Sequence, residues 1–136
     1  MISVLIRNFK RALRKIWFKP EALKSPLSRS KMSTTLLPNV ALNPQANVYF
    51  DGKCVSHSFT LPDGTKKSAG VILPSSLVFN TGAAEIMECV AGSCEYKLAG
   101  SEAWVKSSAG EKFSVPANSK FDIRCAEPYH YICHFA

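Results

Sequence analysis

The 136-residue sequence has only three histidines, no paired-cysteine motif and no long apolar run. No segment approaches the ~20 consecutive apolar residues that a helix needs to cross a bilayer. The five cysteines form no CxxC pair, which argues against a zinc knuckle. Their odd number, without a secretory signal, predicts buried and reduced thiols, so we expect a cytoplasmic protein.

Acidic residues are nearly missing from the N-terminal part of the chain. Residues 1–31 hold nine of the 17 Lys and Arg residues and only one acid, Glu21. Residues 32–136 keep eight basic and nine acidic residues, so their net charge is about −1. The overall charge of +7 therefore comes from the N-terminal part. The remainder has no basic stripe that would predict a nucleic-acid partner.

Residues 1–20 place apolar and basic side chains at three- and four-residue spacing, which predicts an amphipathic helix ending at a proline, or a disordered leader. The segment that follows is rich in Pro, Ser and Asn, as linkers are. Three interpretations remain open: a membrane-surface anchor, an organelle transit peptide, or residues upstream of a true start at Met32. We favour the start at Met32 and expect no membrane contact. The predicted division is a leader and linker over 1–46 and a folded domain over 47–136.

Helical periodicity is missing from residues 47–136. Short alternating runs of apolar and polar residues recur there and end at Gly, Pro or Asn, which predicts roughly nine strands. One of these strands is predicted at 101–104. In residues 120–125, Phe121 and Ile123 would face the core while the residues between them face solvent. The pattern predicts an all-β, single-domain sandwich or closed barrel.

Two motifs resemble the signatures of the cupin barrel, or jelly roll. Glu85 is separated from Gly92 by six residues, as at the end of the first cupin motif, and in the second a glycine and five further residues precede Pro116. The metal-binding histidines of these motifs would fall within residues 78–81 and at position 121, which hold Val-Phe-Asn-Thr and Phe121. Three of four ligand positions therefore cannot bind, and Glu85 alone does not hold an ion. We expect a cupin-like barrel without a metal.

A closer resemblance extends over residues 47–136. Its strings are NVYFDGK, GVILP, FNTGAAEIMECVAG, GEKFSVPANSKF and AEPYHYIC. They are similar, in register, to the small cupin-fold pyrimidine/purine nucleoside phosphorylases. The resemblance implies a homodimeric glycosyltransferase that cleaves purine and pyrimidine nucleosides to free base and α-D-ribose 1-phosphate. It implies no cofactor, with inorganic phosphate as co-substrate. The alternative is a non-catalytic cupin that binds a small ligand.

Phosphorolysis breaks the C1′–N bond through an oxocarbenium-like state, so the protein must hold the sugar, the phosphate and the base. Glu85 is the candidate for the ribose hydroxyls, because a carboxylate on the strand of Met87 would face the interior and require a partner. The alternative for Glu85 is an exposed residue at the rim. Thr81 offers a hydroxyl at a vacated ligand position.

Phosphate and base require different groups. Lys53 and Lys66 are candidates for phosphate, and the alternative for each is a solvated turn. His134 is a candidate donor or acid near the base, or an exposed residue close to the chain end. Apolar walls for the base are expected from aromatic residues, whose alternative role is core packing. These are Phe79, Phe121 and Tyr131.

Overall fold

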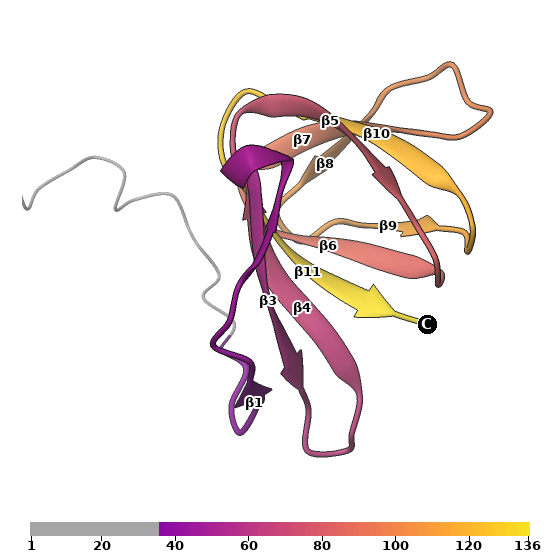
Figure 1. Cartoon of the computed structure of the whole chain (residues 1–136). Coiled ribbons are helices and arrows are strands. Elements are labelled where there is room, and N and C mark those ends of the chain that lie inside the picture. The colour runs from indigo at the N-terminus through magenta and orange to yellow at the C-terminus, as the bar shows by residue number, and fades with distance from the viewer. Residues whose placement is uncertain (1–35) are drawn as a thin grey trace, which may run out of the picture. The chain divides into compact units, whose positions relative to one another are not determined.

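A computed structural model of the chain describes residues 36–136, which form two antiparallel sheets packed face to face (Figure 1). The predicted leader helix and the proposed start at Met32 lie outside the described residues. The larger sheet has seven strands in the order β1-β3-β4-β11-β6-β9, with β2 also paired to β3. The smaller sheet has the order β5-β10-β7-β8. Within residues 36–136, no helix is long and apolar enough to cross a membrane.

The strands are short, and the one 3-10 turn within residues 36–136, η3 (Phe50–Gly52), follows β2. In the larger sheet they are β1 (Ala41–Leu42), β2 (Asn47–Tyr49), β3 (Cys54–Thr60), β4 (Lys66–Ile72), β6 (Glu85–Ala91), β9 (Lys112–Val115) and β11 (Tyr129–Phe135). In the smaller sheet they are β5 (Ser75–Asn80), β7 (Ser93–Leu98), β8 (Val105–Ser108) and β10 (Lys120–Cys125).

The predicted all-β, cupin-like architecture is confirmed, with two differences in detail. β1 lies in the segment predicted as linker and pairs with β3. The strand predicted at 101–104 is wrong, because β8 begins at Val105, which pairs with Tyr96. Trp104 precedes β8, and its ring centroid lies 4.0 Å from the guanidinium carbon of Arg124 in a cation–π contact.

Strand β10 shows how alternation of apolar and polar residues gives one buried face and one exposed face. Phe121 and Ile123 are 2% and 0% exposed, as the alternation predicts. Asp122, between them, faces outward and forms a 3.4 Å salt bridge with Lys97 on β7. The register pairs Phe121 with Phe79 of β5, so aromatic side chains meet on the inner face of the smaller sheet.

The core between the sheets contains most of the cysteines. All five are free, and only Cys125 is not fully buried. Burial raises the pKa of each thiol, and raises that of Cys94 and Cys133 to about 12. The prediction of buried, unpaired thiols is confirmed for four of the five. Such thiols remain protonated at neutral pH and pack as small apolar groups.

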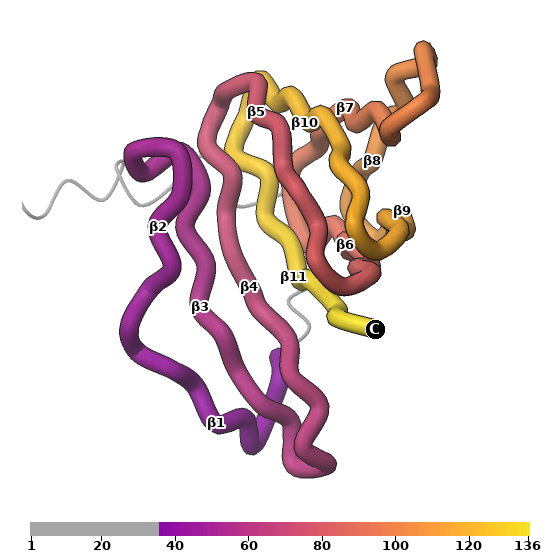
Figure 2. Tube along the Cα trace, turned by 45° about the vertical axis from the view of Figure 1, so that its right-hand side comes forward, coloured from indigo at the N-terminus to yellow at the C-terminus, as the bar shows by residue number. Residues whose placement is uncertain are grey.

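The turn from β6 to β7 requires glycine. Gly92 has φ +76°, and a Cβ there would lie 2.1 Å from the carbonyl oxygen of Pro128. The chain before β11 therefore passes directly over this turn. The close approach fixes where β11 enters the sheet between β4 and β6 (Figure 2).

Candidate functional site

A cavity of about 160 Å³ lies between the two sheets. Strands of both sheets contribute to it, so neither sheet forms it alone. Its lining combines hydroxyl, thiol and carboxyl groups with aromatic rings. The lining residues are Tyr49, Ser56, Ser68, Phe79, Asn80, Glu85, Met87, Phe121, Tyr131, Cys133 and Phe135.

Glu85 supplies the only carboxylate among the residues that line this cavity. It begins β6 and lies on the same side of the strand as the buried Met87 and Cys89. Burial raises the pKa of Glu85, and a hydrogen bond from the Cys133 thiol opposes that rise. The carboxylate is therefore half-buried and lines the cavity together with the Cys133 thiol.

The donor to Glu85 is itself held in place. Cys133 lies on β11, between Ser68 of β4 and Met87 of β6. Burial and the negative charge of Glu85 raise the pKa of the Cys133 thiol to about 12, and a hydrogen bond with Ser68 opposes the rise. A thiol that stays protonated can donate to Glu85 while its sulfur accepts from Ser68. The carboxyl, thiol and hydroxyl groups thus come from three adjacent strands and line the same cavity.

The opposite wall of the cavity is aromatic. The rings of Phe79 and Phe121 stack with centroids 5.4 Å apart and planes 14° apart. Phe50, on η3, meets Phe79 edge-on at 5.1 Å. Phe121 is buried, whereas Phe79 is partly exposed and Phe50 is 40% exposed. The aromatic cluster thus continues from the interior to the surface at Phe50, which does not itself line the cavity.

Tyr131 reaches the cavity because Gly70 leaves room for its hydroxyl. A Cβ at Gly70 would lie 2.8 Å from the Tyr131 hydroxyl oxygen. That hydroxyl lies 3.4 Å from the Cys54 sulfur. Burial raises the pKa of Tyr131, so it remains a neutral donor. The structure therefore brings together Glu85, Phe79, Phe121 and Tyr131, four of the predicted site residues.

Thr81 lies outside the cavity. It is buried, and its hydroxyl donates to the carbonyl of Pro116 at 2.7 Å and accepts from the amide of Ser119 at 3.0 Å. These bonds tie the loop before β6 to the turn between β9 and β10. The hydroxyl is already engaged in joining the two sheets.

His134 lies on the opposite side of β11 from the cavity, because side chains alternate along a strand. Its Nε2 donates to Glu88 at 2.7 Å and its Nδ1 accepts from the ammonium of Lys67. Burial acts to raise the pKa of Glu88, but hydrogen bonds from His134 and Lys112 lower it overall. His134 therefore belongs to an outer-face cluster and is not near the aromatic wall.

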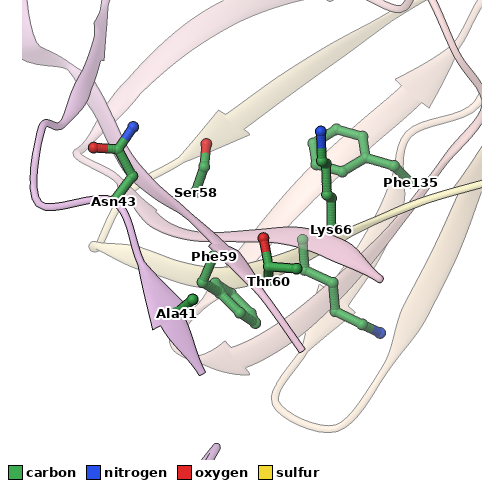
Figure 3. A pocket seen from close by; sticks show the side chains of 8 residues that line it. Ala41, Asn43, Ser58, Phe59, Thr60, Lys66 and Phe135 are labelled. Carbon is green, nitrogen blue, oxygen red and sulfur yellow. The ribbon is translucent and has the colours of Figure 1, made fainter. Parts of the chain in front are cut away.

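The two lysine candidates also lie outside the cavity. Lys53 is exposed after η3, where its carbonyl accepts from the Leu73 amide at 2.8 Å. Lys66 begins β4 and lines a wider neighbouring groove (Figure 3). Phe135 lines both the groove and the cavity.

A sequence model described as pyrimidine/purine nucleoside phosphorylase matches residues 44–135. The chain belongs to this phosphorylase family. A relative of that name from Polaromonas naphthalenivorans (strain CJ2) is 74% identical over 108 residues, covering 77% of this chain and 100% of the relative. Another, from Delftia acidovorans (strain DSM 14801 / SPH-1), is 70% identical over 105 residues, with the same coverage.

The phosphorylase family also has relatives of known structure. A crystal structure of a protein of unknown function from Acinetobacter sp. ADP1 is 42% identical to this chain, with a TM-score of 0.73. The match covers 74% of this chain and 98% of that chain.

In this member of the phosphorylase family, residues 36–136 contain no group of three or more His, Cys, Asp or Glu side chains arranged to hold a metal. The positions of the cupin ligands are taken by Phe79 and Phe121 in the aromatic wall and by Thr81 in its structural bonds. The expectation that the protein works without a metal stays a prediction.

Sequence reasoning missed several residues that line the cavity of this phosphorylase-family protein. Cys133 and Phe135 share the parity of Tyr131 on β11, so alternation alone could have found them. Ser56 and Ser68 depend on the register of β3 against β4, which no single strand pattern contains. Tyr49 and Asn80 lie at strand ends near the mouth. No sequence signal marked them.

Proposed function

We propose that this protein is a nucleoside phosphorylase of broad specificity, a glycosyltransferase that converts purine and pyrimidine nucleosides to free base and α-D-ribose 1-phosphate. One observation carries the proposal. In a chain with 74% identity to a relative of that name, one carboxylate and a pair of stacked aromatic rings line the same cavity. This arrangement supplies an acceptor for sugar hydroxyls and a flat apolar surface for a base.

The reaction balances with phosphate alone. A phosphate oxygen forms a bond to C1′ as the C1′–N bond breaks, and the electron pair of that bond stays on the base nitrogen. The proton of hydrogen phosphate accounts for the proton gained by the base. Ionised Glu85 accepts hydrogen bonds from the ribose hydroxyls, and its charge stabilises the positive character that develops at C1′.

The small volume of the cavity indicates that it encloses only part of a nucleoside. Its volume of about 160 Å³ lies below the ~300–1,000 Å³ of pockets that enclose a whole drug-sized ligand. The ribose then occupies the interior beside Glu85, and the base lies at the mouth against Phe79, near the exposed Tyr49 and Phe50. A base held mainly by stacking, with few hydrogen bonds to its edge, fits tolerance of both purines and pyrimidines.

The proposal has further parts. Phosphate is the co-substrate and no metal or other cofactor takes part. The protein acts in the cytoplasm, where its free thiols stay reduced. It forms a homodimer, and it has neither a nucleic-acid nor a membrane partner.

The test is a product assay on the full chain. Uridine, adenosine or guanosine is incubated with the protein, with and without phosphate and a chelator, and free base is measured by chromatography. Base that forms only with phosphate, and still forms with chelator, supports the proposal. The competing function is ligand binding without catalysis. It is favoured if no nucleoside is cleaved while nucleosides still raise the melting temperature.

A further inference from the structure

A groove of about 510 Å³ lies beside the cavity, at the end of the larger sheet (Figure 3). It is lined by one residue of β1, the turn after it, and the facing ends of β3, β4 and β11. The lining residues are Ala41, Asn43, Ser58, Phe59, Thr60, Lys66, Lys67 and Phe135. Among them are two lysines and no carboxylate, so the groove favours an anion.

Register places part of this groove on the same face as the cavity. On β3 and β4, Ser58 pairs with Ser68 and Thr60 pairs with Lys66. Residues paired across a ladder point to the same side, and Ser68 lines the cavity. Figure 3 shows Ser58, Thr60 and Lys66 on one side of the strands and Phe59 on the other. The face that holds Ser68 therefore continues into Lys66.

The two lysines differ in what they already bind. The ammonium of Lys67 contacts Nδ1 of His134 on the outer face. Lys66 makes no salt bridge or side-chain hydrogen bond within residues 36–136 and is exposed. Lys66 thus has three ammonium donors available to an anion.

Neutral donors beside Lys66 are also free to bind an anion. The Oδ1 of Asn43 accepts from the Gln45 amide at 3.0 Å, which leaves the Asn43 amino group to donate. The backbone of Asn43 is fixed by a 2.9 Å bond to the Ser58 carbonyl. The Ser58 hydroxyl oxygen accepts from the Asn47 side chain at 3.2 Å, so its own proton can donate. On Asn43 and Ser58, the side-chain oxygen already accepts a hydrogen bond from the protein, and the side-chain N–H or O–H group remains available to donate.

We propose that this groove binds the inorganic phosphate co-substrate. Lys66 supplies the positive charge, and Ser58, Thr60 and Asn43 supply neutral donors. This inference rests on the proposed phosphorolysis. It locates the phosphate outside the cavity that holds the ribose, and it assigns Lys66 in preference to Lys53.

The position of the groove suits attack on the sugar. Glu85 of β6 pairs with Phe135 of β11. His134 of β11 pairs with Lys67 of β4, so the next residue along each strand brings Phe135 level with Lys66. Two strand spacings therefore separate Glu85 from Lys66, roughly 10 Å between backbones. A ribose and a phosphate placed between the tips of these side chains fill that distance. The lysine charge then lies on the phosphate side of C1′ and the carboxylate on the ribose side.

Substitution of Lys66 tests the assignment. In the full chain, Lys66→Gln should raise the phosphate KM at least tenfold and change the nucleoside KM less than twofold. Lys66→Arg should restore most of the phosphate affinity, because it keeps the charge. Lys106→Gln is the matched control, since Lys106 is an exposed strand lysine on β8 of the other sheet, and its phosphate KM should equal that of the wild type. Ser58→Ala should give a smaller increase than Lys66→Gln.

A binding measurement separates this inference from the proposed function. Phosphate should raise the melting temperature of the wild type and not that of Lys66→Gln. If the wild type cleaves nucleosides and Lys66→Gln keeps a normal phosphate KM, the groove assignment is wrong and the proposed function stands. If the wild type cleaves none, the proposed function fails, and loss of the phosphate-induced shift in Lys66→Gln still supports the groove. An equal shift in both proteins overturns it.

Discussion

At the scale of single residues, the site depends on a carboxylate whose ionised form is disfavoured by burial. Glu85 is held half-buried beside aromatic rings, with one thiol as donor. Burial without a cationic partner favours the neutral acid and raises the pKa. A carboxylate ionised in such a place lowers stability at neutral pH, which fits a role with substrate.

Replacement of Glu85 separates activity from stability. Glu85→Gln should lower kcat/KM more than tenfold, or more than about 1.4 kcal/mol, because the amide cannot match the carboxylate as an acceptor. The same substitution should increase the stability of the folded protein at neutral pH. The folded pKa is raised, so the stabilising effect of protonated Glu85 is lost as pH rises through that pKa, and glutamine should raise the melting temperature at neutral pH. This advantage should disappear below the ordinary glutamate value of 4.5.

The matched control for Glu85 is Glu102→Gln, which changes an exposed glutamate in the β7–β8 loop. It should leave both kinetics and melting temperature unchanged. Wild-type kinetics in Glu85→Gln would assign Glu85 to the rim rather than to the ribose.

The pH dependence of the wild type gives a second test of the same residue. If ionised Glu85 holds the ribose, kcat/KM should fall on acidification with a midpoint above 4.5, since burial raises this pKa. A pH–rate profile measured with a fixed nucleoside checks it, and the profile of Glu85→Gln is the control, because it retains the titration of phosphate and lacks that of Glu85. A midpoint at or below 4.5 would contradict the assignment.

At the scale of strands, alternation in the sequence predicts much of the structure. The inward residues of β6, β10 and β11 follow it, which is why Glu85, Phe121 and Tyr131 were found together. Alternation also places His134 on the outer face, but the sequence does not show which parity faces the core at a chain end. The positions of Lys53 and Lys66 outside the cavity depend on how strands pair and not on any one strand, and their roles with phosphate stay predictions.

The β6–β7 turn offers a test at this scale. Gly92→Ala combines a left-handed backbone, at about 1–2 kcal/mol, with a clash against the Pro128 carbonyl. Gly100→Ala is the control, because Gly100 has φ +79° and nothing within 4 Å of its Cβ position. Chemical denaturation should show Gly92→Ala losing at least twice the unfolding free energy that Gly100→Ala loses. Equal losses of unfolding free energy in the two variants would show that the Pro128 carbonyl moves aside without cost, and would contradict the prediction.

At the scale of the whole molecule, the cavity exists only because two sheets are packed together. Its carboxylate and thiol come from the larger sheet and its stacked rings from the smaller one. No local pattern contains the packing of one sheet on another, so the membership of Ser56 and Ser68 could not be predicted from the sequence. Knowledge of the fold family helps to predict which residues line the cavity, whereas composition does not.

Assembly is the remaining prediction at this scale. Val48, Tyr49 and Phe50 are consecutive, and 62%, 47% and 40% exposed, on β2 and η3. An apolar edge of this kind is typical of an interface. Light scattering should give twice the chain mass of 14.9 kDa, and Val48→Glu should shift it towards the monomer. Val105→Glu, on β8 and 45% exposed, is the control and should remain dimeric. A monomeric wild type would refute the dimer.

The end of β11 has a practical consequence for anyone producing the protein. The amide of Ala136 donates to the carbonyl of Ala84 at 3.0 Å, and Phe135 lines both the cavity and the groove. A purification handle or reporter fused after Ala136 would emerge next to Glu85, between the cavity and the groove. Such fusions should lose turnover while remaining folded, so kinetic work should use protein with a free C-terminus.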